Sequence, residues 1–177
     1  MHCAAIFNAE PIRTVSDRDV DGLHERACQS QSGHYRLCLH RSVTDPVQEM
    51  IIAVLSSAVF GPHRHPTGKS ETIHILRGEL RTIIFDDEGR VIDILSLSAN
   101  AADNSANGGR VQRLEGGIWH LPLCVSDFAI YHEIYVGPYD RTVDVQSPRW
   151  GPDINDREAQ AAYCAELRRE NNLLVTP

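Results

Sequence analysis

The residues best suited to chemistry in this 177-residue chain are two histidines separated by one residue, His63 and His65, followed by the carboxylate of Glu71. Side chains two positions apart on an extended segment point to the same side, so both imidazoles can reach one point. Pro66 and Gly68 lie before the glutamate and allow the chain to reverse tightly. Imidazole and carboxylate together suit zinc, iron, manganese, nickel or copper. An HxH pair also arises by chance in surface loops, so its neighbours decide the interpretation.

A second stretch, from Gly109 to His120, completes the pattern. Together the two stretches resemble the paired motifs of the cupin superfamily. In the first motif a glycine follows the glutamate after six intervening residues, as Gly78 follows Glu71 here. In the second motif two glycines precede a histidine, and the first glycine of this stretch and Gly117 take those places before His120.

This resemblance implies a fold and a set of metal ligands. Cupins are all-β proteins, so the chain is expected to form a single jelly-roll barrel with short N- and C-terminal helices. The chain departs from the family at Glu115, which stands where proline is usual and loosens the expected turn without removing the ligand position. The implied ligands of a divalent transition metal (iron, manganese, nickel or zinc) are His63, His65, Glu71 and His120.

Over residues 35–152 the chain also resembles the WbuC family of cupin-fold metalloproteins. That family is associated with bacterial surface-polysaccharide gene clusters rather than with an agreed reaction. The glutamate at 115 and an Ala/Asn-rich stretch, residues 98–109, mark the chain as a divergent member. The matching residues keep the family's order: His40-Arg41-Ser42, Asp45-Pro46-Val47-Gln48, Pro62 to Pro66, Lys69, Glu71, Leu76-Arg77-Gly78, Phe85-Asp86, Gly89-Arg90-Val91, Gly117, Trp119-His120, Glu133, Gly137 to Asp140, Trp150 and Pro152.

Composition excludes several classes of function. The net charge of −7 disfavours general binding to nucleic acid or to an anionic membrane surface, and no run of basic residues forms a patch. The five cysteines are odd in number and lack a CxxC pair, which favours reduced thiols in a cytoplasmic protein. The N-terminal residues show no signal-peptide pattern, and no apolar run is long enough to span a membrane. We therefore expect a cytoplasmic protein with a small-molecule ligand.

The elements that must position the motifs are organised around one barrel. We expect an N-terminal arm and short helix over residues 1–34, the cupin barrel over 35–140, and an extended tail and helix over 141–177. Ser16 with Asp19 indicates a cap for a helix at about 17–29. Asn155 is expected to cap a final helix at about 156–170, whose buried stripe would be Ala159, Ala162, Tyr163 and Leu167.

Short apolar segments bounded by turns predict the strands of the barrel. The loop over 98–109 would be an insertion near the rim, either a lid or a bulge without a role. Residues 1–15 could be a loose arm or an added edge strand. The predicted strands are Tyr35 to His40, Val47 to Leu55, Glu71 to Leu76, Glu79 to Phe85, Val91 to Leu97, Val111 to Leu114, Ile118 to Val125 and Phe128 to Val136.

Glu133 is the candidate catalytic residue. If it faces the barrel interior, Tyr131 and Tyr135 face inward too, because the period of a strand is two. A carboxylate in a mostly apolar barrel should have a raised pKa and could act as a general base or acid. The alternative role for Glu133 is to orient a ligand histidine.

Other residues near the motifs are candidates for contact with a substrate. Lys69, in the turn before Glu71, could bind an anionic group or be an ordinary surface lysine. Arg77 shares the parity of Glu71, so it is expected to point inward, toward Glu133 or a substrate carboxylate. Tyr131 and Tyr139 complete the predicted substrate-binding set. Trp119 should point away from the neighbouring His120 and pack against other residues.

Two functions are consistent with these residues. One is a metal-dependent isomerase, lyase or dioxygenase acting on a small polar, sugar-like molecule. The other is a non-catalytic barrel that binds a metal and a ligand, as a sensor or accessory protein. Exposed sheet edges and the N-terminal arm also favour a homodimer.

Overall fold

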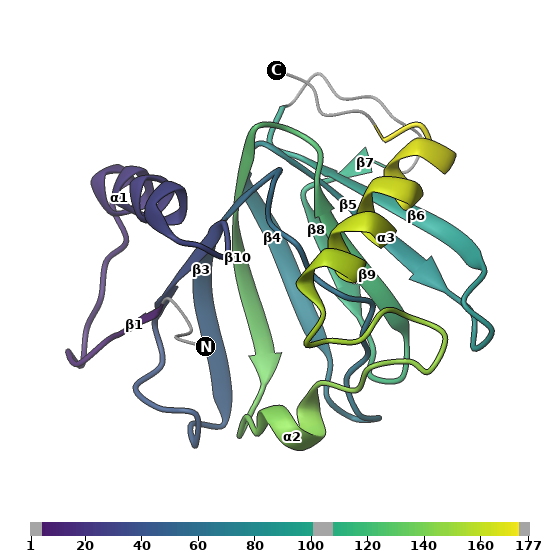
Figure 1. Cartoon of the computed structure of the whole chain (residues 1–177). Coiled ribbons are helices and arrows are strands. Elements are labelled where there is room, and N and C mark those ends of the chain that lie inside the picture. The colour runs from purple at the N-terminus through teal and green to yellow at the C-terminus, as the bar shows by residue number, and fades with distance from the viewer. Residues whose placement is uncertain (1–4, 101–107, 174–177) are drawn as a thin grey trace.

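The computed structural model describes residues 5–100 and 108–173 as two β-sheets packed face to face, with helices on the outside (Figure 1). One sheet has the order β1 (Ala5–Phe7), β2 (His34–Cys38), β3 (Val47–Leu55), β10 (Phe128–Val136), β4 (Glu71–Arg77), β8 (Val111–Leu114). The other has the order β7 (Gly108–Gly109), β6 (Val91–Ser98), β5 (Glu79–Phe85), β9 (Trp119–Cys124). The helices are α1 (Asp17–Gln29), α2 (Arg141–Asp144) and α3 (Arg157–Glu170).

The main core fills the space between the two sheets. Inward-facing residues alternate along each strand, so β3 contributes Ile52 and Val54 while β4 contributes Ile73 and Ile75. Leu80 on β5 meets them from the other sheet. Burial of such aliphatic side chains, at about 1.5–3 kcal/mol each, holds the barrel together without a metal.

Helix α1 covers the outer face of β2 and β3. Its cap is the predicted one: Ser16 accepts a hydrogen bond from the backbone N–H of Asp19, and the Asp19 carboxylate accepts one from the backbone N–H of Ser16. Its buried stripe consists of Val20, Leu23 and Ala27. The N-terminal segment forms β1, a parallel edge strand beside β2, so the edge-strand alternative is confirmed for the described part of the arm.

Helix α3 covers the outer face of the second sheet, where Leu167 packs with Leu121 and other residues of β5 and β9 (Figure 1). The prediction for this helix was wrong in detail. Asp156, not Asn155, is the cap, because its carboxylate accepts a hydrogen bond from the backbone N–H of Ala159. Of the predicted stripe Leu167 is buried, Ala159 and Tyr163 are half-buried and Ala162 is exposed, while Gln160 and Cys164 are buried as well. A narrow apolar stripe defined the helix but not its rotation.

The long loop after β6 falls mostly outside the described residues, so the predicted lid or bulge at 98–109 stays a prediction. Only Ser98 to Asn100 and the short strand β7 are described. Among the residues with a described structure, no helix is long and apolar enough to cross a membrane.

Candidate metal centre

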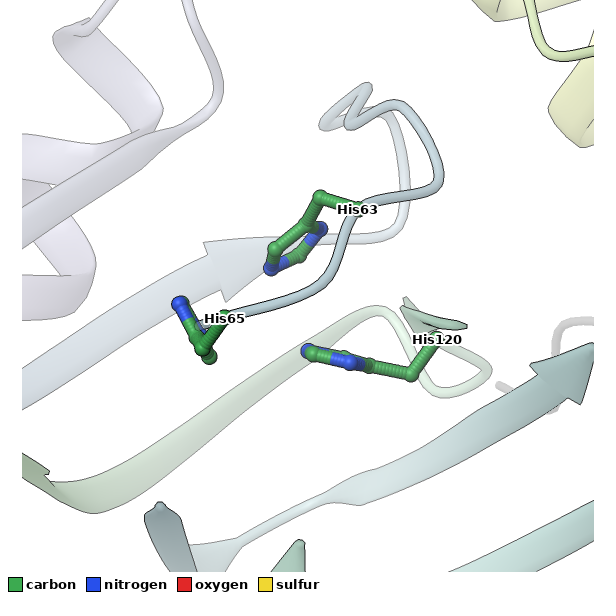
Figure 2. Close-up of side chains that lie close together, drawn as sticks. All are labelled: His63, His65 and His120. Atoms are coloured by element: carbon green, nitrogen blue, oxygen red, sulfur yellow. The ribbon is translucent and has the colours of Figure 1, made fainter. Parts of the chain in front are cut away.

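The predicted HxH pair lies in the connection between β3 and β4, at one end of the barrel. His63 forms a β-bridge with His120 on β9, through backbone hydrogen bonds of 3.0 and 2.8 Å. Arg64 forms a second bridge with Gln146, beyond α2, with two backbone hydrogen bonds of 3.0 Å. The pair is therefore held from both sides, and the extended backbone turns both imidazoles toward His120 (Figure 2). Arg64, between them, instead lies over the ring of Trp119.

Each of the three rings is fixed by a backbone carbonyl on its Nδ1 side. The Nδ1 atom of His63 lies 3.2 Å from the carbonyl oxygen of Gly61, and that of His120 lies 2.9 Å from the carbonyl oxygen of Ile118. For His65 the acceptor is the carbonyl oxygen of Asp144, at 2.7 Å. A carbonyl oxygen can only accept, so each Nδ1 carries a proton, and the neutral form of each ring has its lone pair on Nε2.

The ligand atoms of the three histidines all lie within 4.8 Å of one another. Glu71 lies against two of them, because its Oε2 is 3.1 Å from His65 Nε2 and its Oε1 is 3.1 Å from His120 Nε2. Of these atoms, Glu71 Oε1 and His120 Nε2 are buried and have no well-aligned hydrogen-bond partner among the described residues. Two buried acceptors facing each other are costly, and a cation between them would satisfy both.

The pKa values of His63, His65 and Glu71 are shifted in different directions. Burial and the neighbouring His120 lower the pKa of His63 to about 3, so this ring is neutral at physiological pH. Burial opposes a charge on His65, but its hydrogen bond to Glu71 and the charge of that carboxylate raise the pKa of His65. Burial likewise opposes a charge on Glu71, yet His120 and His65 hold its pKa well below its usual range. Glu71 is therefore an anion whose charge a proton on His65 or a bound cation can balance.

The donor set fits a divalent transition metal. Three imidazole nitrogens with their second nitrogens bonded to carbonyls are the arrangement that metal-binding histidines usually show. The three histidines form the cluster, and Glu71 contacts two of its members, so the predicted role of Glu71 as a fourth ligand stays a prediction. Three protein nitrogens leave further coordination positions for the carboxylate, water or a ligand oxygen.

The catalytic candidate Glu133 lies on the inner face of β10. It is paired with Met50 of β3 and Ile73 of β4. The next inward-facing residue of β10 is Tyr135, which is paired with Glu71. Burial, and then the charge of Glu71, raise the pKa of Glu133 to about 7.

The inward orientation of the flanking tyrosines is confirmed. Tyr131 is buried in the main core, where desolvation raises its pKa. Tyr135 is buried with its ring centroid 4.6 Å from that of His65. The predicted contact of Tyr131 with a substrate stays a prediction, as does that of Tyr139, whose half-buried ring packs edge-on against Tyr135.

The predicted inward orientation of Arg77 was wrong. Its guanidinium lies 2.5 Å from the carboxylate of Asp21 on α1, on the outer side of the sheet. The cause is a β-bulge: β10 advances by one residue, from Tyr131 to Ile130, while β4 advances by two, from Ile75 to Arg77. The extra residue reverses the parity that relates Arg77 to Glu71.

Lys69 lies beside the site but its ammonium group is already bound. Its Nζ is 2.7 Å from a carboxylate oxygen of Asp144 and donates a second hydrogen bond to the carbonyl oxygen of Pro138. Sequence reasoning missed Asp144, which is 1% exposed and 75 positions away from Lys69, so no local spacing could reveal it. A role for Lys69 in binding an anionic ligand stays a prediction.

Behind the HxH loop lies a shallow groove of about 310 Å³, separate from the histidine cluster. There Arg64 stacks over the ring of Trp119 at 4.2 Å and donates a hydrogen bond to Gln146 at 2.9 Å. Trp119 is buried under α3 and donates to Asp87 at 3.0 Å. The prediction that Trp119 points away from His120 is confirmed. The polar side chains of the groove already bind one another.

The chain resembles known proteins in fold more than in sequence. The sequence profile of a family described as a domain of unknown function (DUF6016) matches residues 15–97, less than half of the chain. No curated protein matches the chain in sequence. Protein SO0799 from Shewanella oneidensis has a similar structure, with a TM-score of 0.54 at 14% identity over 84% of this chain and 90% of that one.

Two enzymes show looser structural similarity. A single-residue variant of oxalate decarboxylase from Bacillus subtilis aligns with a TM-score of 0.46 at 15% identity, over 64% of this chain and 27% of that one. Oxalate oxidase in complex with the substrate analogue glycolate aligns with a TM-score of 0.47 at 15% identity, over 66% of this chain and 55% of that one. This chain thus spans only part of either enzyme, and likenesses this loose do not bear on its chemistry.

The fold is the predicted all-β jelly roll. Its two sheets enclose one core, short helices flank it near both ends of the chain, and the histidines of both motifs meet at the mouth of the barrel.

Proposed function

We propose that this protein binds a divalent transition metal through His63, His65 and His120, with Glu71 as the fourth ligand. The observation that carries the proposal is the fixed orientation of the three rings. Each Nδ1 donates to a backbone carbonyl, so the Nε2 atoms of the three rings are turned toward one another, and the Glu71 carboxylate lies 3.1 Å from two of them. The identity of the metal, among iron, manganese, nickel and zinc, is left open by a donor set of this kind.

We further propose that the metal serves a reaction on a small polar, sugar-like molecule, in which Glu133 accepts or donates a proton. A bound metal would supply Lewis acidity to an oxygen of the substrate. Glu133 faces the same lumen with a pKa of about 7, the value at which a carboxyl group exchanges protons well at neutral pH. Gln112 on β8 is paired with Ile73 on β4. Its buried amide oxygen has no hydrogen-bond partner among the described residues and could accept a hydrogen bond from a substrate hydroxyl.

The reaction class could be isomerisation, elimination or dioxygen chemistry. Resemblance of the sequence motifs to the WbuC family supports a link to surface-polysaccharide metabolism in the cytoplasm. The alternative proposal is a non-catalytic barrel that binds a metal and a ligand. Two ion pairs favour it, because Lys69 binds Asp144 and Arg77 binds Asp21. Fewer charged groups are therefore available to a substrate than the sequence suggested.

We also propose a homodimer that forms through the outer face of β3, β10, β4 and β8, beyond the part covered by α1. Many of the exposed large apolar side chains gather there. Glu49, Ile134, Thr72 and Arg113 form one row across the four strands. A two-fold axis along the strands would set Glu49 of each copy opposite Arg113 of the other. The apolar residues of this face are Val47, Leu76, Val111, Ile134 and Val136.

Metal analysis tests the central proposal. Purified protein dialysed against buffer should retain about one equivalent of a transition metal, because the three nitrogens are already oriented. Changing both His65 and His120 to alanine should abolish metal binding while the far-ultraviolet circular dichroism spectrum stays that of a β-protein. A matched control changes His74 and His132, a cross-strand pair outside the site, to alanine and should keep the metal. Metal retained in the first double variant would refute the assignment.

A further inference from the structure

The segment from Pro138 to Gln146, here called the strap, lies against the HxH loop and contains the short helix α2. It contacts the loop at two adjacent residues, Arg64 and His65. Gln146 and Arg64 form a β-bridge through their backbones. The carbonyl oxygen of Asp144 accepts the hydrogen bond from Nδ1 of His65. The orientation of one metal-binding ring therefore depends on where the strap places a single carbonyl group.

That carbonyl belongs to the most deeply buried acid of the strap. The side chain of Asp144 is 1% exposed, and its Oδ2 accepts hydrogen bonds from the backbone N–H of Asp140 at 2.8 Å and from Lys69 Nζ at 2.7 Å. Lys69 donates as well to the carbonyl oxygen of Pro138, so it ties the first residue of the strap and the last residue of α2 to one point. Tyr135 closes the cage, since its ring lies 5.6 Å from Lys69 Nζ and 4.6 Å, centroid to centroid, from the ring of His65.

Lys69 occupies a particular place in the chain. It lies in the turn between His65 and Glu71, and its backbone N–H closes that turn on the carbonyl oxygen of Pro66 at 3.0 Å. The ion pair thus connects the turn that carries two metal-binding residues with the strap that orients one of them. Buried ion pairs add little to stability compared with apolar contacts, so a pair at this position is better explained by the geometry it imposes.

We propose that the Lys69–Asp144 ion pair is a positioning device that fixes the tautomer and direction of His65 and thereby sets the affinity of the metal centre. The inference rests on the proposed metal function and adds residues that do not touch the metal. Partners that orient a metal-binding histidine typically change metal affinity by about 10- to 100-fold when they are removed.

The test compares Lys69→Met, Asp144→Asn and the double variant with wild type, using titration of the metal-free protein with Zn²⁺ and Co²⁺. Each single variant should bind both ions about 10- to 100-fold more weakly. The double variant should be no weaker than the weaker single variant, because both changes disable the same device. Arg113→Met, which breaks an exposed ion pair with Glu115 at 3.0 Å, is the matched control and should bind within about twofold of wild type.

A second measurement keeps the inference separate from the metal proposal. In the metal-free protein, the Nδ1–H proton of His65 is buried and hydrogen-bonded, so it should give a slowly exchanging imidazole resonance in the proton NMR spectrum. That resonance should shift or disappear in Lys69→Met and stay unchanged in Arg113→Met. Wild type that fails to bind any metal would refute the metal proposal, whereas unchanged metal affinity and an unchanged His65 resonance in folded variants would overturn the positioning role. If Lys69→Met does not fold, the double variant, which removes the buried charge on both sides, decides by the same two readouts.

Discussion

Replacement of Glu133 by glutamine should remove a pH-dependent cost of folding. The folded state raises the pKa of this carboxyl from its ordinary 4.5 to about 7, through burial and the charge of Glu71. Folded protein therefore keeps a proton that the unfolded chain releases between these values, so this group lowers stability as the pH rises from about 4.5 to 7. The shift corresponds to at most about 3 kcal/mol above pH 7, and solvent access to the half-buried side chain reduces it to about 2 kcal/mol.

The assay is thermal unfolding of metal-free wild type and Glu133→Gln from pH 4.5 to pH 8.5. The variant should melt about 4–8 °C higher at pH 8.5 and within about 1 °C of wild type at pH 4.5, since 1 kcal/mol shifts the midpoint of a domain this size by about 2–4 °C. Addition of metal should shrink the difference, because the nearby positive charge favours the ionised carboxylate.

Parallel melting curves at every pH would refute this reasoning, because they would mean that the Glu133 carboxyl titrates normally. The same variant also separates the two proposed functions. Under the enzyme proposal Glu133→Gln keeps its metal and lowers turnover of an identified substrate by about a hundredfold or more. Turnover unchanged by the substitution would favour the non-catalytic alternative.

Two further outcomes follow from the site and from the outer sheet face. Metal affinity should rise as the pH increases above 6.5, the ordinary pKa of histidine, with release of protons on binding, because the raised pKa of His65 makes a proton compete with the metal. Isothermal titration in buffers of different ionisation enthalpy measures this, and a flat profile would contradict it. Four strands with a spacing of about 4.8 Å give the four-strand face an area of about 400 Å² per copy. A standard interface buries about 800 Å² per partner, so this one would be small. We therefore expect a micromolar dimer that Ile134→Asp weakens by about tenfold or more. Sedimentation of only the 19.8 kDa species at about 100 μM, well above such a dissociation constant, would count against it.

The histidine cluster could be predicted from sequence because the relevant information is local. A spacing of two puts His63 and His65 on one side of an extended segment, and the glycines of the second motif frame His120. The capping box of α1 was readable for the same reason, since Ser16 and Asp19 complete it within one helical turn. Local rules of this kind need no knowledge of what packs against the segment.

The strap could not be predicted because it depends on contacts between distant parts of the chain. Asp144 carries no motif, and its importance comes from Lys69 and His65, which approach it only in the folded barrel. The rotation of α3 failed for a related reason. Leu167 is buried as predicted, but Gln160, which donates a hydrogen bond to the carbonyl oxygen of Asp153, is buried beside the half-buried Ala159, and a polar residue in this place is not indicated by an apolar pattern.

The orientations of Arg77 and Glu133 show where alternation along a strand predicts the direction of a side chain. Counting residues in twos related Arg77 to Glu71 and the two tyrosines to Glu133, yet only the count to Arg77 crosses a bulge. The β4–β10 pairing is regular from Tyr131 to Tyr135, so Glu133 keeps its place on the inner face, and the pairing slips just beyond Tyr131, so Arg77 turns toward α1. The arginine whose charge acts on Glu133 is Arg36 on β2, and burial together with the charge of Glu71 outweighs it, so the pKa of Glu133 is raised.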